Sequence, residues 1–99
     1  MDTYLVERYL PDISEEALLA ACSRTMAAAA EMKAAGVPVH YLGSTFAPEE
    51  ESCFCLFTGP SLAAVREANE RANFAFARIV PVTRIFPTST GSASTTQGQ

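Results

Sequence analysis

The sequence predicts a small α+β domain in which two β-α-β halves follow one another. Three observations predict it: runs of residues with strand-like alternation, two segments with helical spacing and good caps, and glycine or proline at most of the junctions. Ninety-nine residues, 48% of them apolar and 18% charged, have the balance of one globular domain. We assign residues 1–86 to this domain. Residues 87–99, PTSTGSASTTQGQ, form a disordered tail, because that composition cannot bury enough apolar surface to become ordered.

The first half begins with a strand over Thr3–Tyr9, which alternates and is rich in β-formers. Ser14 is a good N-cap for the helix that follows, and two glutamates occupy its first turn, where the helix dipole favours acids. Gly36 provides the C-cap. Helical spacing predicts that this helix buries Leu18, Cys22, Met26, Ala29 and Met32.

The second half contains two strands, a helix and a last strand. Val37–Phe46 and Cys53–Thr58 form a hairpin across a short polar turn. Ser61 caps the second helix, and Arg78–Phe86 returns as a strand in which Pro81 indicates an edge position or a bulge. The buried stripe of the second helix is expected to be Leu62, Val65, Ala68 and Ala72.

This β-α-β-β-α-β order is the ferredoxin-like plan. It places both helices on one face of a four-stranded antiparallel sheet and leaves the other face bare. Because several strands carry apolar residues on both sides, we expect the chain to form a homodimer through that open face.

Composition excludes some partners and favours one compartment. The net charge is −4, so nucleic acid and anionic membrane surfaces, which attract basic faces, are not expected partners. No secretory signal or transmembrane span is visible. The three cysteines are an odd number, which favours free thiols in the cytoplasm.

The single histidine, His40, is the first candidate for chemistry. Alternation places it on one side of its strand with Leu42 and Ser44, and places Val39 and Tyr41 on the other side. We expect the more apolar pair to face the helices, which leaves His40 on the open face. It then serves either as a hydrogen-bonded residue of a dimer interface or as a metal ligand or acid/base group.

Cys53 and Cys55 are two residues apart, so both side chains project from one face of their strand. Buried cysteines often act as small hydrophobes, and a C-x-C pair is a weaker metal signal than paired C-x-x-C knuckles. The alternative is a soft-ion site in which His40, on the neighbouring strand, supplies a third ligand.

Two acidic features complete the candidate set. Glu7 and Arg8 are neighbours in the first strand, so one of them must turn toward an apolar layer, where it needs a partner or a metal. Glu7 is expected within reach of the cysteines, or else in a salt bridge at the strand end. Glu50 lies at the centre of the run Glu49–Glu51, which is either a solvated turn or a weak divalent-ion site completed by a second copy.

Five segments of the chain resemble a family of small bacterial nickel-binding proteins that once carried a domain-of-unknown-function label. The similarity extends from about Thr3 to Ile85. It is carried by YLVERYLPD (Tyr4–Asp12), VHYLGSTF (Val39–Phe46), CFCLFTGPS (Cys53–Ser61), AAVREANERA (Ala63–Ala72) and ARIVPV (Ala77–Val82).

The resemblance implies a ferredoxin-like homodimer that holds nickel at its surface and sequesters excess metal. The family pattern of strand residues falls here on Glu7, His40, Ser44 and Cys55 (or Cys53). The chain departs from that pattern twice. Residues 72–75 lack an expected glycine and proline, and the acidic turn has three glutamates where a lysine is more usual. The second departure changes the charge of the turn and can strengthen or weaken a surface metal site, so the family's ligands do not transfer directly to this turn.

Three functions follow from these residues. The leading one is a non-catalytic protein that binds nickel or another divalent metal, using His40, Glu7, Cys53, Cys55 and Glu50. The second is a small dimeric enzyme that uses His40 and Glu7 as acid and base on an apolar substrate. The third is a protein-interaction module. The common nucleotide-binding, hydrolase and zinc-protease motifs are absent from the sequence.

Overall fold

The computed structural model describes residues 1–87, so the predicted tail, apart from Pro87, lies outside the described residues. The elements, in chain order, are β1 (Asp2–Tyr9), α1 (Glu15–Ala34), β2 (His40–Ala47), a single 3₁₀ turn η1 (Pro48–Glu50), β3 (Ser52–Gly59), α2 (Leu62–Arg71) and β4 (Arg78–Val82). The predicted β-α-β-β-α-β order is therefore confirmed. Ser14 and Ser61 cap the two helices, each accepting a hydrogen bond from a backbone N–H three residues later.

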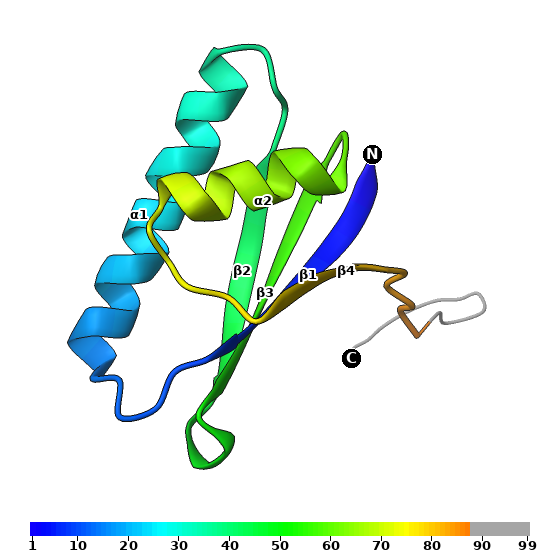
Figure 1. Ribbon diagram of the computed structural model, residues 1–99. Helices are drawn as coiled ribbons and strands as arrows, with labels where there is room; N and C mark the ends of the chain where they lie inside the picture. The colour runs from blue at the N-terminus through cyan, green and yellow to red at the C-terminus, as the bar shows by residue number, and fades with distance from the viewer. Residues whose placement is uncertain (88–99) are drawn as a thin grey trace.

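The strands form one four-stranded sheet in the order β2-β3-β1-β4, with every neighbouring pair antiparallel. Both helices cover the same face of this sheet (Figure 1), which is the ferredoxin-like α+β arrangement. The core lies between the sheet and the helices and includes Val6, Met32, Val39, Phe57 and Val65. Within residues 1–87, no helix is both long and apolar enough to span a membrane.

The buried stripe of α1 differs from the predicted one. Its buried residues are Ala21, Thr25, Ala28, Ala29 and Met32. Met26, expected inside, is 61% exposed. Alanine occupies so many positions of α1 that side-chain size does not mark the inner face. Thr25 is tolerated inside because its hydroxyl donates a hydrogen bond of 2.9 Å to the Ala21 carbonyl, which satisfies the polar group.

A bulge interrupts the pairing of β2 with β3 between Tyr41 and Gly43. Gly43 has a φ of +136°, a conformation that residues with a β-carbon rarely adopt. Because one residue is inserted, Ser44 pairs with Cys55 and shares its face, although simple alternation had placed Ser44 beside His40. The predicted face of Ser44 was therefore wrong. The predicted inward side of Val39 and Tyr41 is correct, since Val39 is buried and Tyr41 pairs with the buried Phe57.

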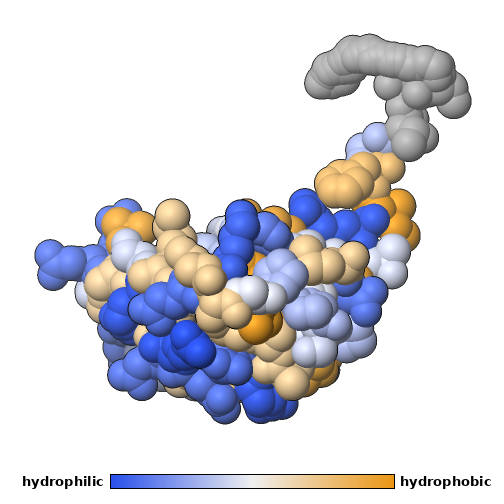
Figure 2. Space-filling view, turned by 90° about the horizontal axis from the view of Figure 1, so that it is seen from above, coloured by the Kyte–Doolittle hydropathy of each residue, from blue (hydrophilic) through white to orange (hydrophobic). Residues whose placement is uncertain are grey.

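The last strand ends at Val82 rather than at the predicted Phe86. β4 pairs only with β1, and Val82 already lies opposite Thr3, so little of β1 remains to pair with the residues that follow. Ile85 and Phe86 are accordingly 88% and 62% exposed. In the space-filling view, hydrophobic side chains continue from the body of the molecule along the segment that leads to the grey residues (Figure 2).

Candidate functional site

The face of the sheet that the helices leave open carries a central apolar row between two more polar rows. Residues paired across antiparallel strands point to the same side, so the register defines these rows. They are His40-Thr58-Thr3-Val82, then Gly43-Leu56-Leu5-Val80, then Thr45-Phe54-Glu7-Arg78. None of these open-face residues is buried in the single chain. The sheet thus presents a layer of leucine and valine to whatever lies against it.

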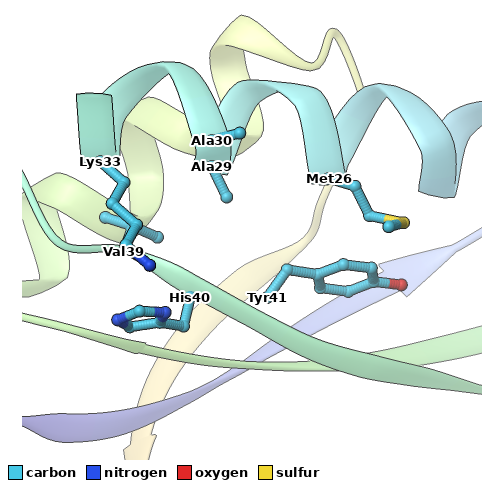
Figure 3. A pocket seen from close by; sticks show the side chains of 7 residues that line it. All are labelled: Met26, Ala29, Ala30, Lys33, Val39, His40 and Tyr41. Carbon is cyan, nitrogen blue, oxygen red and sulfur yellow. The ribbon is translucent and has the colours of Figure 1, made fainter. Parts of the chain in front are cut away.

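His40 lies in the first of these rows, on the open face as expected. In Figure 3 its imidazole is on the side of β2 away from α1, whereas Lys33 and Met26 extend from α1 toward the strand. A hollow of about 210 Å³ lies between α1 and the β2 edge. It is smaller than typical small-molecule sites of roughly 300–1,000 Å³.

Glu7 lies on the same open face but far from His40. It pairs with Phe54 across the sheet, and His40 pairs with Thr58, four residues along the same strand. That offset corresponds to about 13 Å along the strand direction. Glu7 is engaged by Arg78, whose Nε donates to Glu7 Oε1 at 2.5 Å. The sequence allowed Glu7 either a salt bridge or a place near the cysteines, and the structure shows the salt bridge. It does not bring Glu7 to His40 or to the cysteines.

Glu50 is exposed in the η1 turn, at the opposite end of β2 from His40. Its neighbour Glu51 is occupied locally, accepting hydrogen bonds from the Tyr9 hydroxyl (3.2 Å) and the Asp12 backbone N–H (3.0 Å). Among residues 1–87, no three histidine, cysteine, aspartate or glutamate side chains are grouped closely enough to hold a metal ion.

Cys53 and Cys55 face the helices, on the side of the sheet opposite His40. Both are completely buried, and their sulfur atoms are 3.9 Å apart. They are free thiols, as expected. The sheet itself therefore separates the cysteines from the histidine that the sequence analysis had grouped with them.

Arg8 is the residue of the first strand that turns inward. It follows Tyr4 and Val6 on the helix-facing side and is only 1% exposed. Its Nε donates to Cys55 Sγ at 3.3 Å, and one terminal nitrogen donates to Asn69 Oδ1 at 2.5 Å. The other terminal nitrogen donates to the carbonyl of Phe74 at 3.0 Å and to that of Ala75 at 3.3 Å.

No carboxylate is among the hydrogen-bond partners that Arg8 has within residues 1–87. Its guanidinium carbon also lies 3.7 Å from the centroid of the Phe74 ring, a cation–π contact. The sequence requires Glu7 or Arg8 to turn inward, and the structure shows that Arg8 does so. Tyr4 and Val6, an aromatic and a β-branched residue, precede Arg8 at intervals of two residues. This alternation is the sequence signal that places Arg8 on their buried face.

Three further side chains, Ser44, Tyr41 and Cys22, form a chain of contacts that leads from Cys55 toward α1. Ser44 Oγ lies 2.9 Å from Cys55 Sγ and is hydrogen-bonded to the Tyr41 hydroxyl. Cys22, half-buried on α1, donates to the same Ser44 oxygen at 3.9 Å. A chain of polar atoms therefore connects the molecular surface with the buried Cys55 thiol.

This environment separates the pKa values of the two buried thiols. The pKa of Cys55 is lowered to about 6, chiefly by the hydrogen bond from Cys53, with further lowering by the charge of Arg8 and the hydrogen bond from Ser44. The pKa of Cys53 is raised well above its usual range, because its proton is held by Cys55 and because the thiol is buried. Cys55 is thus the more acidic of the two thiols.

Comparison with known proteins identifies the family. The model of a family described as nickel responsive protein, SCO4226-like, matches residues 4–82. The chain belongs to the SCO4226-like family. No curated protein matches the chain. The fold is shared with the solved structure described as SCO4226 from Streptomyces coelicolor A3(2), with a TM-score of 0.72 and 22% identity over 85% of this chain and 99% of that one.

This SCO4226-like chain keeps its nitrogen and oxygen donors apart from its thiols. Of the candidate ligands, His40 and Glu7 lie on the open face and Glu50 lies in the turn after β2, whereas the three thiols lie on the helix side. The expected ligand set of His40, Glu7, Cys53, Cys55 and Glu50 is therefore not assembled within one protomer. The contribution of Arg8, the buried arginine that contacts Cys55 and Asn69, to the stability of the fold can be tested first.

Replacing Arg8 by alanine should destabilise this protein strongly. The change leaves the Asn69 amide oxygen and two carbonyls without their donor, and breaking a buried charged network by removing one partner costs about 3–5 kcal/mol. Urea unfolding followed by circular dichroism measures the loss. Arg71→Ala is the matched control, because Arg71 lies on α2, pairs with the exposed Glu67 and Glu31, and its removal should leave the midpoint almost unchanged. Equal effects of the two substitutions would contradict the assigned role of Arg8.

The stability should rise with pH between about 6 and the ordinary thiol pKa of about 8.5, because Cys55 is deprotonated when folded and protonated when unfolded over that range. A single such group contributes at most about 1.4 kcal/mol per pH unit. At higher pH the raised pKa of Cys53 reverses the slope. Urea midpoints of the wild type should show the rise and those of Cys55→Ser should not, while Cys22→Ser keeps it. A slope that persists in Cys55→Ser would assign the rise to another group.

Proposed function

We propose that this protein binds nickel(II) on the open face of its sheet through His40, as a homodimer in which a second copy completes the ligand set. The observation that carries the proposal is the position of His40: the chain has one imidazole, and it lies on the open face of a member of a nickel-responsive family. Holding nickel, rather than catalysing a reaction, is the activity proposed.

The donor chemistry of the open face suits this ion. Imidazole and carboxylate are donors that nickel(II) accepts, and the affinity order of divalent metals places copper above nickel at such a site. Glu7 and Glu50 are the carboxylates proposed to join His40. Use of Glu7 requires it to leave Arg78, which is an exposed ion pair and therefore weakly held.

A second copy is needed because residues 1–87 of one protomer do not bring three donors together. His40 is about 13 Å from the Glu7 row along the strands, and Glu50 lies beyond the other end of β2. The apolar row of Leu5, Leu56 and Val80 gives two copies a surface to pack through. A two-fold axis between two such faces places every donor twice at the interface.

The alternative of an acid/base enzyme is less well supported by this geometry. His40 and Glu7 would have to act on one substrate, and they are separated across the open face rather than directed into one pocket.

The three free thiols fit a reducing compartment, so we place the protein in the cytoplasm.

Isothermal titration with nickel(II) should show saturable binding that His40→Ala weakens at least about tenfold, because the change removes the only imidazole. Thr58→Ala is the matched control, since Thr58 pairs with His40 on the same face but offers no strong donor. Glu7→Gln and Glu50→Gln then show which carboxylate takes part. Nickel affinity unchanged in His40→Ala would refute the proposed site.

Substituting Leu56→Glu should convert a dimer into monomers, because it places a charge in the central apolar row of the open face. Sedimentation velocity measures the change, and circular dichroism checks that the monomer is folded. Leu19→Glu is the control: Leu19 is 60% exposed on α1, away from the sheet, and its substitution should leave the dimer intact. A wild-type protein that sediments as a monomer with and without nickel would exclude pairing through this face.

A further inference from the structure

The two buried thiols form a pair that the proposed nickel site does not use. Cys53 and Cys55 project from one face of β3 with their sulfur atoms 3.9 Å apart, and both are fully buried. Two sulfur donors this close together are near the spacing of a two-coordinate site, in which an ion lies between two thiolates. Soft thiolate ligands select soft ions such as Cu(I).

The charge beside the pair selects the ion further. Arg8 is a fixed buried cation whose Nε donates to Cys55, and its partners within residues 1–87 are otherwise neutral oxygens. A monovalent cation held by two thiolates gives a complex with one negative charge, which balances the guanidinium. A divalent ion between the same two thiolates would give a neutral complex and leave Arg8 without a counter-charge in the core.

We propose that Cys53 and Cys55 form a binding site for a soft monovalent cation, Cu(I), as a linear dithiolate that Arg8 neutralises. When the ion enters, two metal–sulfur bonds form and every proton still held by the two thiols is released to solvent, with no electron transferred. This is a second site with a different ion, and it goes beyond the nickel binding proposed for the open face.

The pair needs only a small adjustment to take the ion. With the zinc–thiolate bond length of about 2.3 Å as a guide, a linear complex separates its sulfurs by about 4.6 Å, so the observed 3.9 Å must widen by about 0.7 Å. Rotation of the Cys53 and Cys55 side chains, which point to the same face of β3, can widen the distance between the two sulfurs by this amount. Tetrahedral zinc, by contrast, needs four ligands, and no three-donor group is present among residues 1–87.

A route from the surface leads to the pair. Cys22 is half-buried and touches Ser44, and Ser44 in turn touches Cys55 at 2.9 Å. A soft ion captured by the Cys22 thiol can therefore reach Cys55 by movement of the Ser44 side chain. Cys22 should govern the rate of loading, while the two buried thiols govern the affinity.

The test is an anaerobic titration of the full chain with Cu(I), in competition with the chromophoric chelator bathocuproine disulfonate. We expect one Cu(I) per chain, with a loss of affinity in Cys53→Ser and in Cys55→Ser that exceeds the roughly 10–100-fold caused by loss of a residue that only supports a ligand. Cys22→Ser is the matched control and should keep the equilibrium affinity while loading more slowly. All variants are compared by circular dichroism, so that loss of binding is separated from loss of fold.

X-ray absorption at the copper edge of the wild type tests the site without any variant. Two sulfur neighbours are expected, and a nitrogen neighbour or a third sulfur would overturn the linear dithiolate. The site is equally refuted when Cys55→Ser, still folded, binds Cu(I) as tightly as the wild type. His40→Ala should leave Cu(I) binding unchanged, and Cys55→Ser should leave nickel binding unchanged, so each proposal can fail without the other.

Discussion

The arrangement of this molecule depends on the burial of Arg8. Its guanidinium joins β1 to β3 through Cys55, to α2 through Asn69, and to the segment before β4 through the carbonyls of Phe74 and Ala75. These contacts fix which side of β1 faces inward, because neighbouring strand residues point to opposite faces. Glu7 is consequently on the open face, where it meets Arg78 instead of the cysteines.

The bulge in the edge strand β2 likewise determines which residues of that strand face the helices. Without the extra residue at Leu42, Ser44 would share the face of His40; with it, Ser44 turns inward and hydrogen-bonds Cys55. One irregularity thus moves a hydroxyl from the proposed nickel face to the thiol side, and it leaves His40 among threonines and apolar residues.

The fold could be predicted from local signals, but the site could not. Caps such as Ser14 and Ser61 and the order of the strands are written into short stretches of sequence, and they determine the architecture. The inner face of α1 was missed because alanine does not distinguish one helical face from another. The grouping of His40 with the cysteines failed for a different reason: the two strands pair as expected, but pairing says nothing about face until the register and its bulge are known.

The separation of donors by the sheet has a chemical consequence. On the open face, His40 and Glu7 lie in different rows of the sheet, so the nickel site proposed there requires donors from a second copy. In the core, two thiols are close together and next to a permanent cation, so they disfavour a divalent ion with a larger ligand demand. Because Arg8 cannot lose its proton, the cation beside the two thiols is permanent. The same arginine that stabilises the fold therefore also sets the charge that any ion bound by the two thiols has to match.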